Sequence, residues 1–319
     1  MSNFISEDQI EQALMQKLQH LHGFDVLDCH TDNAEDLNDG SNRASKRDVI
    51  LIDRLREAVL RLNPDIPREA IESALEKLCE RRQAMTLIAA NQEIYGLLRD
   101  GIPVTFDNAQ GQSQQERVRL LDFNAPGNNR FLAVTQLWIK GERGFRRPDV
   151  LLYVNGIPLV FIELKNSNVK LRNAYDDNLT NYKAEIPQLF LTNAFCVLSN
   201  AVETRVGSIT AQWEHYFNWL RTDDEKQKID RAAIRAQGAS LEGVIEGLLP
   251  QQKLLDYVEN FVLYYKDTQK IIAQNHQFIG VNRAYDVFLQ REELAGKLGV
   301  FCHAQESGKS FSMIFYATK

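Results

Sequence analysis

The chain has 319 residues, of which 44% are hydrophobic and 25% charged, and its formal net charge is −6. These values are typical of a globular protein and exclude a disordered chain or a fibrous repeat, and no apolar run is long enough to cross a membrane. Nine acidic side chains and one lysine lie within residues 1–40, so the rest of the chain is slightly basic. The overall charge therefore does not exclude a nucleic acid as a partner, because binding depends on local charge.

The cysteines and the N-terminal residues bear on cellular location. The four cysteines are widely separated in the sequence, and no two have the spacing of metal ligands: Cys29, Cys79, Cys196 and Cys302. Such isolated cysteines favour a reducing compartment. The first residues contain neither the basic segment nor the apolar run of a signal peptide. We therefore expect a cytoplasmic protein without a membrane partner.

The hydrophobic pattern predicts helices first and strands afterwards. Apolar residues recur at helical spacing over 7–22, 47–62 and 67–84, with a polar loop over 31–46. After Gly101 the period changes, and strands are expected over 103–106, 118–123, 131–139, 149–154 and 157–164. A helix over 174–185 and a strand over 194–198 follow. Beyond a charged linker over 222–230, we expect helices over 251–265 and 282–295 and a strand over 298–302.

This order of elements predicts an α/β protein with a mixed sheet flanked by helices. The length favours two domains, because an average domain has about 150 residues. The charged linker places the boundary, so we expect one domain over 1–225 and the start of a second over 226–319.

Three ionisable residues lie at the ends of two apolar segments. Asp149 opens the first segment, and Glu163 and Lys165 close the second. Side chains alternate along a strand, so Glu163 and Lys165 point the same way. Two carboxylates suit a divalent cation such as Mg²⁺ beside a scissile phosphate. A lysine there can orient the attacking water or stabilise the negative charge that builds on the phosphoryl oxygens. The alternative is that all three are surface charges at strand ends.

The turn between the two segments tests whether these side chains meet. Asn155-Gly156 is a strong hairpin signal. A simple two-residue turn there would place Asp149 and Glu163 on opposite faces of the sheet, whereas an odd loop over 155–157 with a bulge at Gly156 would place them on the same face. We therefore predict a bulged hairpin.

Basic residues flank the three ionisable residues on both sides. Arg146 and Arg147 precede Asp149, and Lys170 and Arg172 follow Lys165. A basic collar around an acidic metal site is suited to a DNA backbone. The alternative is an ordinary solvated face.

The Pro148-Asp149 and Glu163-Leu-Lys165 pattern resembles the PD-(D/E)xK nuclease motif. Its surroundings resemble the restriction (motor) subunit of type I restriction–modification enzymes, over Arg146–Asn166, Asn181–Phe190, Thr204–Ala211 and Ser307–Ser310. The resemblance implies Mg²⁺-dependent cleavage of double-stranded DNA by Asp149, Glu163 and Lys165. It also implies ATP-driven DNA translocation and a complex with modification and specificity subunits.

The resemblance extends to the helix that follows Lys165 and to the first helix. The family carries a Gln-xxx-Tyr pair near the DNA, and the matching positions are Asn178, which departs from the pattern, and Tyr182. Many nucleases of this fold also carry a glutamate on the first helix, for which Glu7 and Glu11 are the candidates, with a solvent-facing position as the alternative.

The end of the chain resembles the phosphate-binding loop of an ATP-driven motor. Gly308, Lys309 and Ser310 match the last three positions of that motif, His303 stands at its first glycine, and Glu306 adds negative charge. Gln277 resembles the glutamine that reads adenine in such motors, and an exposed loop amide is the alternative.

The resemblance implies the incomplete start of a RecA-like motor domain, because the chain ends nine residues after Ser310. We therefore expect no ATP hydrolysis and little ATP binding by this chain. We also expect residues 303–319 to be poorly ordered or held in a conformation unlike that of a motor. Two other functions remain open: a P-loop ATPase whose N-terminal region only docks partners, and a non-catalytic assembly module that kept the nuclease fold.

Overall fold

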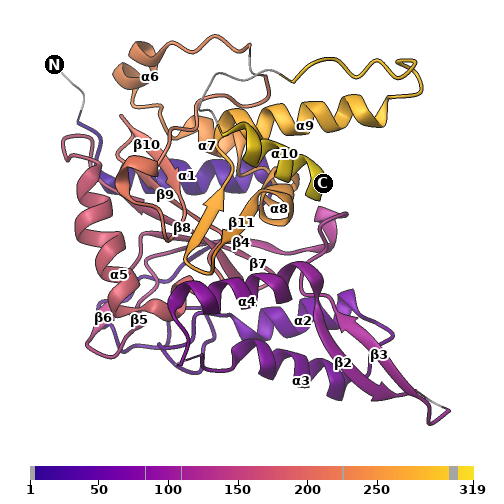
Figure 1. The fold of residues 1–319 in the computed structure, drawn as a ribbon. Helices are drawn as coiled ribbons and strands as arrows, with labels where there is room; N and C mark the ends of the chain where they lie inside the picture. Colours follow the sequence, from indigo (N-terminus) through magenta and orange to yellow (C-terminus); the bar gives the residue numbers. More distant parts are fainter. Residues whose placement is uncertain (1–3, 83, 109, 225, 302–307) are drawn as a thin grey trace.

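A six-stranded mixed sheet forms the centre of the computed structural model, which describes residues 4–82, 84–108, 110–224, 226–301 and 308–319. The strands lie in the order β1 (Asp25–Asp28), β4 (Phe131–Thr135), β7 (Val150–Val154), β8 (Ile157–Leu164), β9 (Phe195–Ser199) and β10 (Thr204–Gly207). Figure 1 shows this sheet at the centre of the protein, with helices around it. The β1–β4 and β8–β9 pairs are parallel, and the other neighbours are antiparallel. The predicted mixed α/β architecture is confirmed.

The central strands of the sheet are buried on both faces, whereas the edge strand β1 is largely exposed. Every residue of β7 and β8 is buried, which is why these segments read as continuous apolar runs. Along β7, Val150, Leu152 and Val154 enter one hydrophobic cluster, and Leu151 and Tyr153 enter another. The alternation of side chains along a strand thus divides the core into two layers.

Helices cover both layers. The first layer contains buried residues of α1 (Glu7–His22), α2 (Ile52–Leu62), α3 (Arg68–Cys79), α4 (Leu87–Asp100), α7 (Glu242–Gly247), α8 (Gln251–Asn260), α9 (Asn275–Leu289) and α10 (Lys309–Thr318). The second layer contains a π-helical segment, Ala174–Leu179, which continues into α5 (Thr180–Glu185). The short helix α6 (Arg231–Gln237) has no buried residue. Short 3₁₀ turns occupy Pro126–Asn128, Pro187–Phe190 and Trp213–His215.

Three two-stranded hairpins complete the fold. They are β2 (Ile102–Asp107) with β3 (Ser113–Val118), β5 (Ile139–Lys140) with β6 (Phe145–Arg146), and β11 (Val262–Tyr265) with β12 (Gln269–Ile272). In Figure 1 the β2–β3 hairpin extends away from the body of the protein. Among the described helices, none is both long and apolar enough to cross a bilayer.

Local sequence signals explain where α1 begins and ends. Ser6 accepts a hydrogen bond from the backbone N–H of Gln9, and the Gln9 side chain accepts one from Ser6, which completes a capping box. Gly23 ends the helix in a left-handed conformation, with φ of 66°. The predicted helix over 7–22 is confirmed.

Several predicted elements differ from the structure. Helix α4 and strands β1 and β10 were not predicted, and the strand expected over 118–123 instead ends at Val118. The helix expected over 251–265 ends at Asn260, because Val262–Tyr265 pairs with Gln269–Ile272. The last predicted helix spans Asn275–Leu289 instead of 282–295. The strand expected over 298–302 is wrong for the described residues 298–301, where Val300 is 92% exposed.

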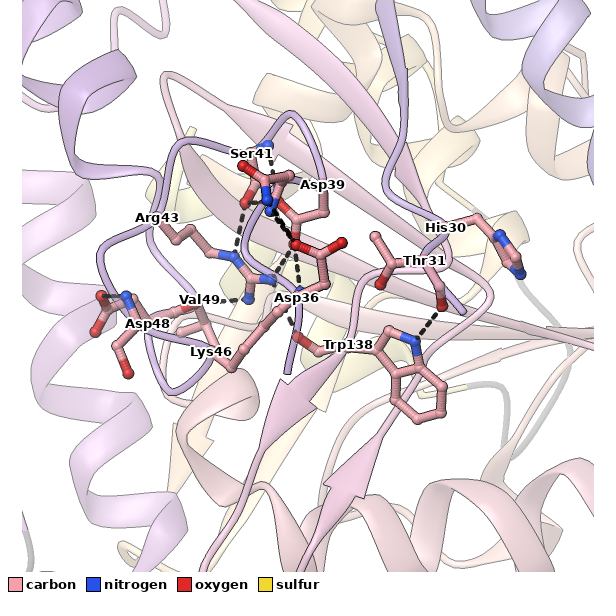
Figure 2. A network of polar contacts seen from close by, with 12 residues as sticks. His30, Thr31, Asp36, Asp39, Ser41, Arg43, Lys46, Asp48, Val49 and Trp138 are labelled. Carbon is pink, nitrogen blue, oxygen red and sulfur yellow. Dashed lines mark hydrogen bonds and ion pairs between the residues drawn. The ribbon is translucent and has the colours of Figure 1, made fainter. Parts of the chain in front are cut away.

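A buried ionic cluster holds the loop before α2, as Figure 2 shows. Because this loop is not helical, α2 begins at Ile52 instead of residue 47. The carboxylate of Asp39 accepts hydrogen bonds from Arg43 Nη2 at 2.8 Å and Lys46 Nζ at 2.7 Å, and the side chains of Asp39 and Arg43 are fully buried. Arg43 Nη2 also donates to the carbonyl oxygen of Trp138, 3.1 Å away. The cluster therefore ties this loop to the chain that leaves the sheet after β4.

Candidate active site

The β7–β8 hairpin begins with the predicted turn. Asn155 and Gly156 both adopt left-handed backbone, with φ of 51° and 81°. The Asn155 side chain is fully buried, and its amide nitrogen donates to the carbonyl oxygen of Leu120 at 2.9 Å. Val154 pairs with Ile157 across this two-residue turn. A left-handed pair of this kind fits the twist of a tight hairpin.

The predicted bulge is confirmed, but it lies within β8 and not at Gly156. Tyr153 pairs with Pro158, whereas Leu152 pairs with Val160, so Leu159 is the extra residue. Pro158 has no N–H to contribute to the ladder, which favours an irregularity beside it. The bulge shifts the register so that Asp149 and Glu163, the residues next to the Val150–Ile162 pair, lie at the same end of the hairpin.

The three predicted catalytic residues lie together at that end. Asp149 Oδ2 accepts a hydrogen bond from the backbone N–H of Leu164 at 2.7 Å. Lys165 Nζ lies 3.0 Å from Glu163 Oε1 and donates to the Leu164 carbonyl oxygen at 2.8 Å. Glu163 is only 1% exposed, and its Oε2 atom has no hydrogen-bond partner among the described residues. A buried carboxylate oxygen without a partner is costly and marks a place for a cation or a proton.

Burial and like charge perturb the ionisation of both carboxyl groups. Burial raises the pKa of Asp149 to about 6, although the Leu164 N–H opposes the shift. Burial, reinforced by the charge of Asp149, raises the pKa of Glu163 well above its ordinary value. Burial would lower the pKa of Lys165, but Glu163 and Asp149 outweigh it and raise that pKa. Perturbed carboxyl groups beside a lysine are typical of sites that bind cations or transfer protons.

Helix α1 brings two more carboxylates to this end of the hairpin. Glu7 Oε1 accepts a hydrogen bond from the backbone N–H of Asn166 at 3.2 Å, and its charge acts on Asp149, Glu163 and Lys165. Glu11 Oε2 accepts one from Gln136 Nε2 at 2.6 Å. Burial, with the charge of Asp149 among the smaller causes, raises the pKa of Glu11 to about 7. Both glutamates are thus half-buried and hydrogen-bonded, which favours a place beside the site over a solvent-facing one.

The donor set fits a hard divalent cation in part. Asp149 and Glu163 supply carboxylate oxygens, the ligand type that Mg²⁺ prefers, and the unpartnered Glu163 Oε2 is available to a ligand. Within the described part of the chain, no group of three or more acidic, histidine or cysteine side chains is arranged to hold a metal ion. The site therefore offers a pair of carboxylates, and water or substrate oxygens would have to complete the coordination.

The helical segment after Lys165 places Tyr182 beside the carboxylates. Tyr182 is 8% exposed, and its hydroxyl donates to the carbonyl oxygen of Arg147 at 3.3 Å. Burial, with the charge of Glu163, raises the pKa of Tyr182, and a side-chain hydrogen bond with Asn178 opposes the shift. Asn178 and Tyr182 therefore contact each other, although Asn178 departs from the family pattern.

The predicted basic collar divides into paired and unpaired residues. Arg146 forms an ion pair with Glu185, and Arg172 forms one with Asp176 at 3.0 Å. The guanidinium of Arg147 lies over the ring of Trp138, 4.8 Å from its centroid, and its charge also reaches Asp149. Lys170 is exposed. Among the described residues, Arg147 and Lys170 have no ion pair with an acidic side chain.

The predicted ATP-binding residues meet at the start of α10. Gln277 is 3% exposed, so the alternative of an exposed loop amide is wrong. Its Oε1 accepts from the backbone N–H of Gln274 at 2.8 Å, and its Nε2 donates to the Gly308 carbonyl oxygen at 2.9 Å. Lys309 and Ser310 are exposed, whereas His303 and Glu306 lie outside the described residues.

The described end of the chain is ordered as helix. Phe315 of α10 is fully buried and lies 5.5 Å from the ring of Phe261, measured between centroids. Of the two expected alternatives, poor order is wrong for residues 308–319, and a conformation unlike that of a motor stays a prediction.

Sequence reasoning did not identify two residues that contact the predicted site. Gln136 bonds both Glu11 and the backbone of Asp149, and Trp138 supports Arg147. Both residues lay inside the strand expected over 131–139, whereas β4 ends at Thr135, so the sequence pattern gave no signal for either residue.

Comparison with known proteins agrees with the resemblance seen in the sequence. A family model described as "Type I restriction enzyme R protein N terminus" matches residues 4–215. The chain is 38% identical over 328 residues to the type I restriction enzyme HindI endonuclease subunit of Haemophilus influenzae, covering 99% of this chain and 30% of that protein. It is 30% identical over 337 residues to the putative type I restriction enzyme MjaIXP endonuclease subunit of Methanocaldococcus jannaschii, covering 99% and 31%. The chain thus spans about a third of the length of these relatives, and it belongs to the family of type I restriction enzyme R protein N-terminal regions.

Proposed function

We propose that this chain is the nuclease region of a type I restriction enzyme and that it cleaves double-stranded DNA at Asp149, Glu163 and Lys165. The relatives are type I restriction endonuclease subunits, which supports a role in restriction. The observation that carries the proposal is the meeting of these three side chains at one end of a bulged hairpin, where Glu163 Oε2 is buried without a partner among the described residues. In fold terms, we propose that the sheet and its helices form a PD-(D/E)xK core.

In this proposal Asp149 and Glu163 would hold Mg²⁺, which would stabilise negative charge on the reacting phosphate and lower the pKa of a water molecule. The backbone N–H of Leu164 fixes the carboxylate of Asp149 by a hydrogen bond. The ammonium of Lys165 fixes the carboxylate of Glu163 by a hydrogen bond to Oε1. The Lys165 ammonium then faces the phosphoryl oxygens, where a positive charge stabilises the transition state. Tyr182 steadies the backbone before Asp149 through the Arg147 carbonyl oxygen.

The basic residues supply the DNA backbone contacts. Arg147 and Lys170 carry charge that no acidic side chain of the described residues neutralises, so they are the stronger candidates for phosphate contacts. Arg146 and Arg172 are held by Glu185 and Asp176, and DNA would have to compete with those carboxylates. Asn178, next to Tyr182, offers an amide to the same surface.

We assign the nuclease to residues 1–225 and the beginning of an ATP-driven motor to 226–319. The hydrophobic cluster continues from Trp219 into Tyr257 and Phe278, so the second part is anchored on the first. Gly308, Lys309, Ser310 and Gln277 are the proposed ATP-binding residues. In a complete subunit we propose that ATP drives translocation of DNA in the cytoplasm, in a complex with modification and specificity subunits.

The test is cleavage of DNA by the complete enzyme that carries this chain. We expect Asp149→Asn, Glu163→Gln and Lys165→Met each to reduce cleavage more than about 100-fold while ATP hydrolysis is unchanged, because each residue serves phosphodiester chemistry. Glu116→Gln, on the exposed strand β3, is the matched control and should cleave at the parent rate. Parental cleavage by the Glu163→Gln variant would show that the reaction does not use this site.

A further inference from the structure

Gln136 has a backbone conformation that a residue with a Cβ adopts at a cost. It directly follows β4, and its φ of 55° lies in the left-handed region. Its neighbours are fixed, because Thr135 is 4% exposed and pairs with Val150, and Leu137 is fully buried. Glycine and asparagine adopt this conformation more readily than glutamine does. The conformation therefore costs free energy at Gln136 that it would not cost at a glycine or an asparagine.

Both ends of Gln136 contact the carboxylate site. Its backbone N–H donates to the Asp149 carbonyl oxygen at 3.0 Å. Its side-chain Nε2 donates to Glu11 Oε2 at 2.6 Å, which connects β4 with α1. One residue thus fixes the backbone of the first catalytic carboxylate and the side chain of a neighbouring one.

The contact controls a third negative charge at the site. Burial of Glu11 opposes the ionisation of its carboxyl group, and so does the charge of Asp149. The hydrogen bond from Gln136 favours the ionised form. A cation held by Asp149 and Glu163 would also be attracted by the negative charge of Glu11. Without the amide of Gln136, Glu11 would be free to turn towards solvent.

We propose that Gln136 is a positioning residue of the cleavage site, which holds the carboxylate of Glu11 beside Asp149 so that its charge strengthens cation binding by Asp149 and Glu163. The inference rests on the proposed function, because it concerns the same cation and the same reaction.

Substitutions that suit left-handed backbone separate this role from a purely structural one. Gln136→Gly and Gln136→Asn relieve the backbone cost, but neither side chain reaches Glu11. We expect the melting temperature (Tm) of both variants to equal or exceed that of the parent chain. Calorimetric titration of the 319-residue chain with MgCl₂ should give a Kd at least fivefold higher than the parent value. DNA cleavage by the complete enzyme should fall at least tenfold.

A second set of measurements tests whether Gln136 acts through Glu11. Glu11→Ala should weaken Mg²⁺ binding as much as Gln136→Gly does, and the double variant should show no further loss.

The outcomes distinguish this inference from the proposed function. Parental Mg²⁺ binding and cleavage by both Gln136 variants, with loss of both in Asp149→Ala, would overturn the role of Gln136 alone. A lower Tm in both variants would also overturn it, because Gln136 would then serve stability. If the parent chain does not bind Mg²⁺, or if Asp149→Ala binds it equally well, the proposed function itself is wrong.

Discussion

The backbone N–H of Leu164 donates a 2.7 Å hydrogen bond to the carboxylate of Asp149, the residue directly before the neighbouring strand β7. This contact joins the start of β7 to the end of β8, where Glu163 and Lys165 flank Leu164 in the sequence. It depends on the bulge at Leu159, because a regular hairpin would turn Asp149 to the other face. The irregularity of the hairpin is thus what assembles the candidate site.

Removing a carboxylate charge from the site should stabilise the protein while it abolishes cleavage. Burial raises the pKa of Asp149 in the folded protein to about 6, so the folded state favours the protonated carboxyl. The stability that this protonation contributes is complete below the pKa of the unfolded state and is lost as the pH rises through 6. We expect Asp149→Asn to increase the free energy of unfolding at pH 8 by about 2 kcal/mol, with little change at pH 4. Urea denaturation at the two pH values measures this. A variant less stable than the parent at pH 8 would show that the carboxylate has a stabilising partner.

Binding of Mg²⁺ should release protons. The pKa of Asp149 is about 6 and that of Glu163 is well above its ordinary value, so a cation must displace protons from the pair near neutral pH. We expect the affinity for Mg²⁺ to increase at least tenfold between pH 5.5 and pH 7.5. Titration calorimetry in two buffers of different ionisation enthalpy counts the protons. Affinity that is independent of pH, with no proton release, would place the cation elsewhere.

The buried cluster around Asp39 should be essential for folding. Asp39→Ala leaves Arg43 and Lys46 buried without their carboxylate, which costs about 3–5 kcal/mol for such a pair. Asp32→Ala, at an exposed position of the same loop, is the control and should change the free energy of unfolding by less than about 0.5 kcal/mol. Guanidinium denaturation compares the two variants, and equal stabilities would contradict the prediction.

The same cluster predicts a limit to acid stability. Burial alone would raise the pKa of Asp39, but hydrogen bonds from Lys46, Ser41 and Arg43 lower it to about 2. A lowered folded-state pKa contributes stability that is present above the unfolded pKa, near 4, and is lost as the pH falls towards 2. The difference between parent and Asp39→Ala should therefore shrink between pH 4 and pH 2.

ATP should bind weakly to this chain. The described residues 298–301 form no strand in front of the phosphate-binding motif, and both ends of the Gln277 amide are engaged within the protein. A phosphate-binding loop requires backbone N–H groups fixed between a strand and a helix. We expect a Kd for Mg-ATP above about 100 μM, equivalent to less than about 5.5 kcal/mol of binding free energy. Calorimetric titration tests it, and a low micromolar Kd in the parent chain would contradict it.

The sequence by itself determined the α/β class, the position of α1, the Asn155-Gly156 turn and the three ionisable residues of the candidate site. These features depend on neighbouring residues: helical spacing, a capping box, a left-handed turn and apolar segments that end in charge. The need for a bulge also followed from the sequence, because strand alternation alone shows that Asp149 and Glu163 otherwise face apart.

Only the tertiary structure decided where the bulge lies and which distant residues join the site. Its position at Leu159 follows from the pairing of Pro158 with Tyr153, and the contact between Gln136 and Glu11 joins residues 125 positions apart in the sequence. The same holds for Asp39, whose link to Trp138 through Arg43 fixes a loop that the sequence shows only as polar. Such contacts are set by how strands and helices pack, and periodicity along the chain carries no information about partners so far apart.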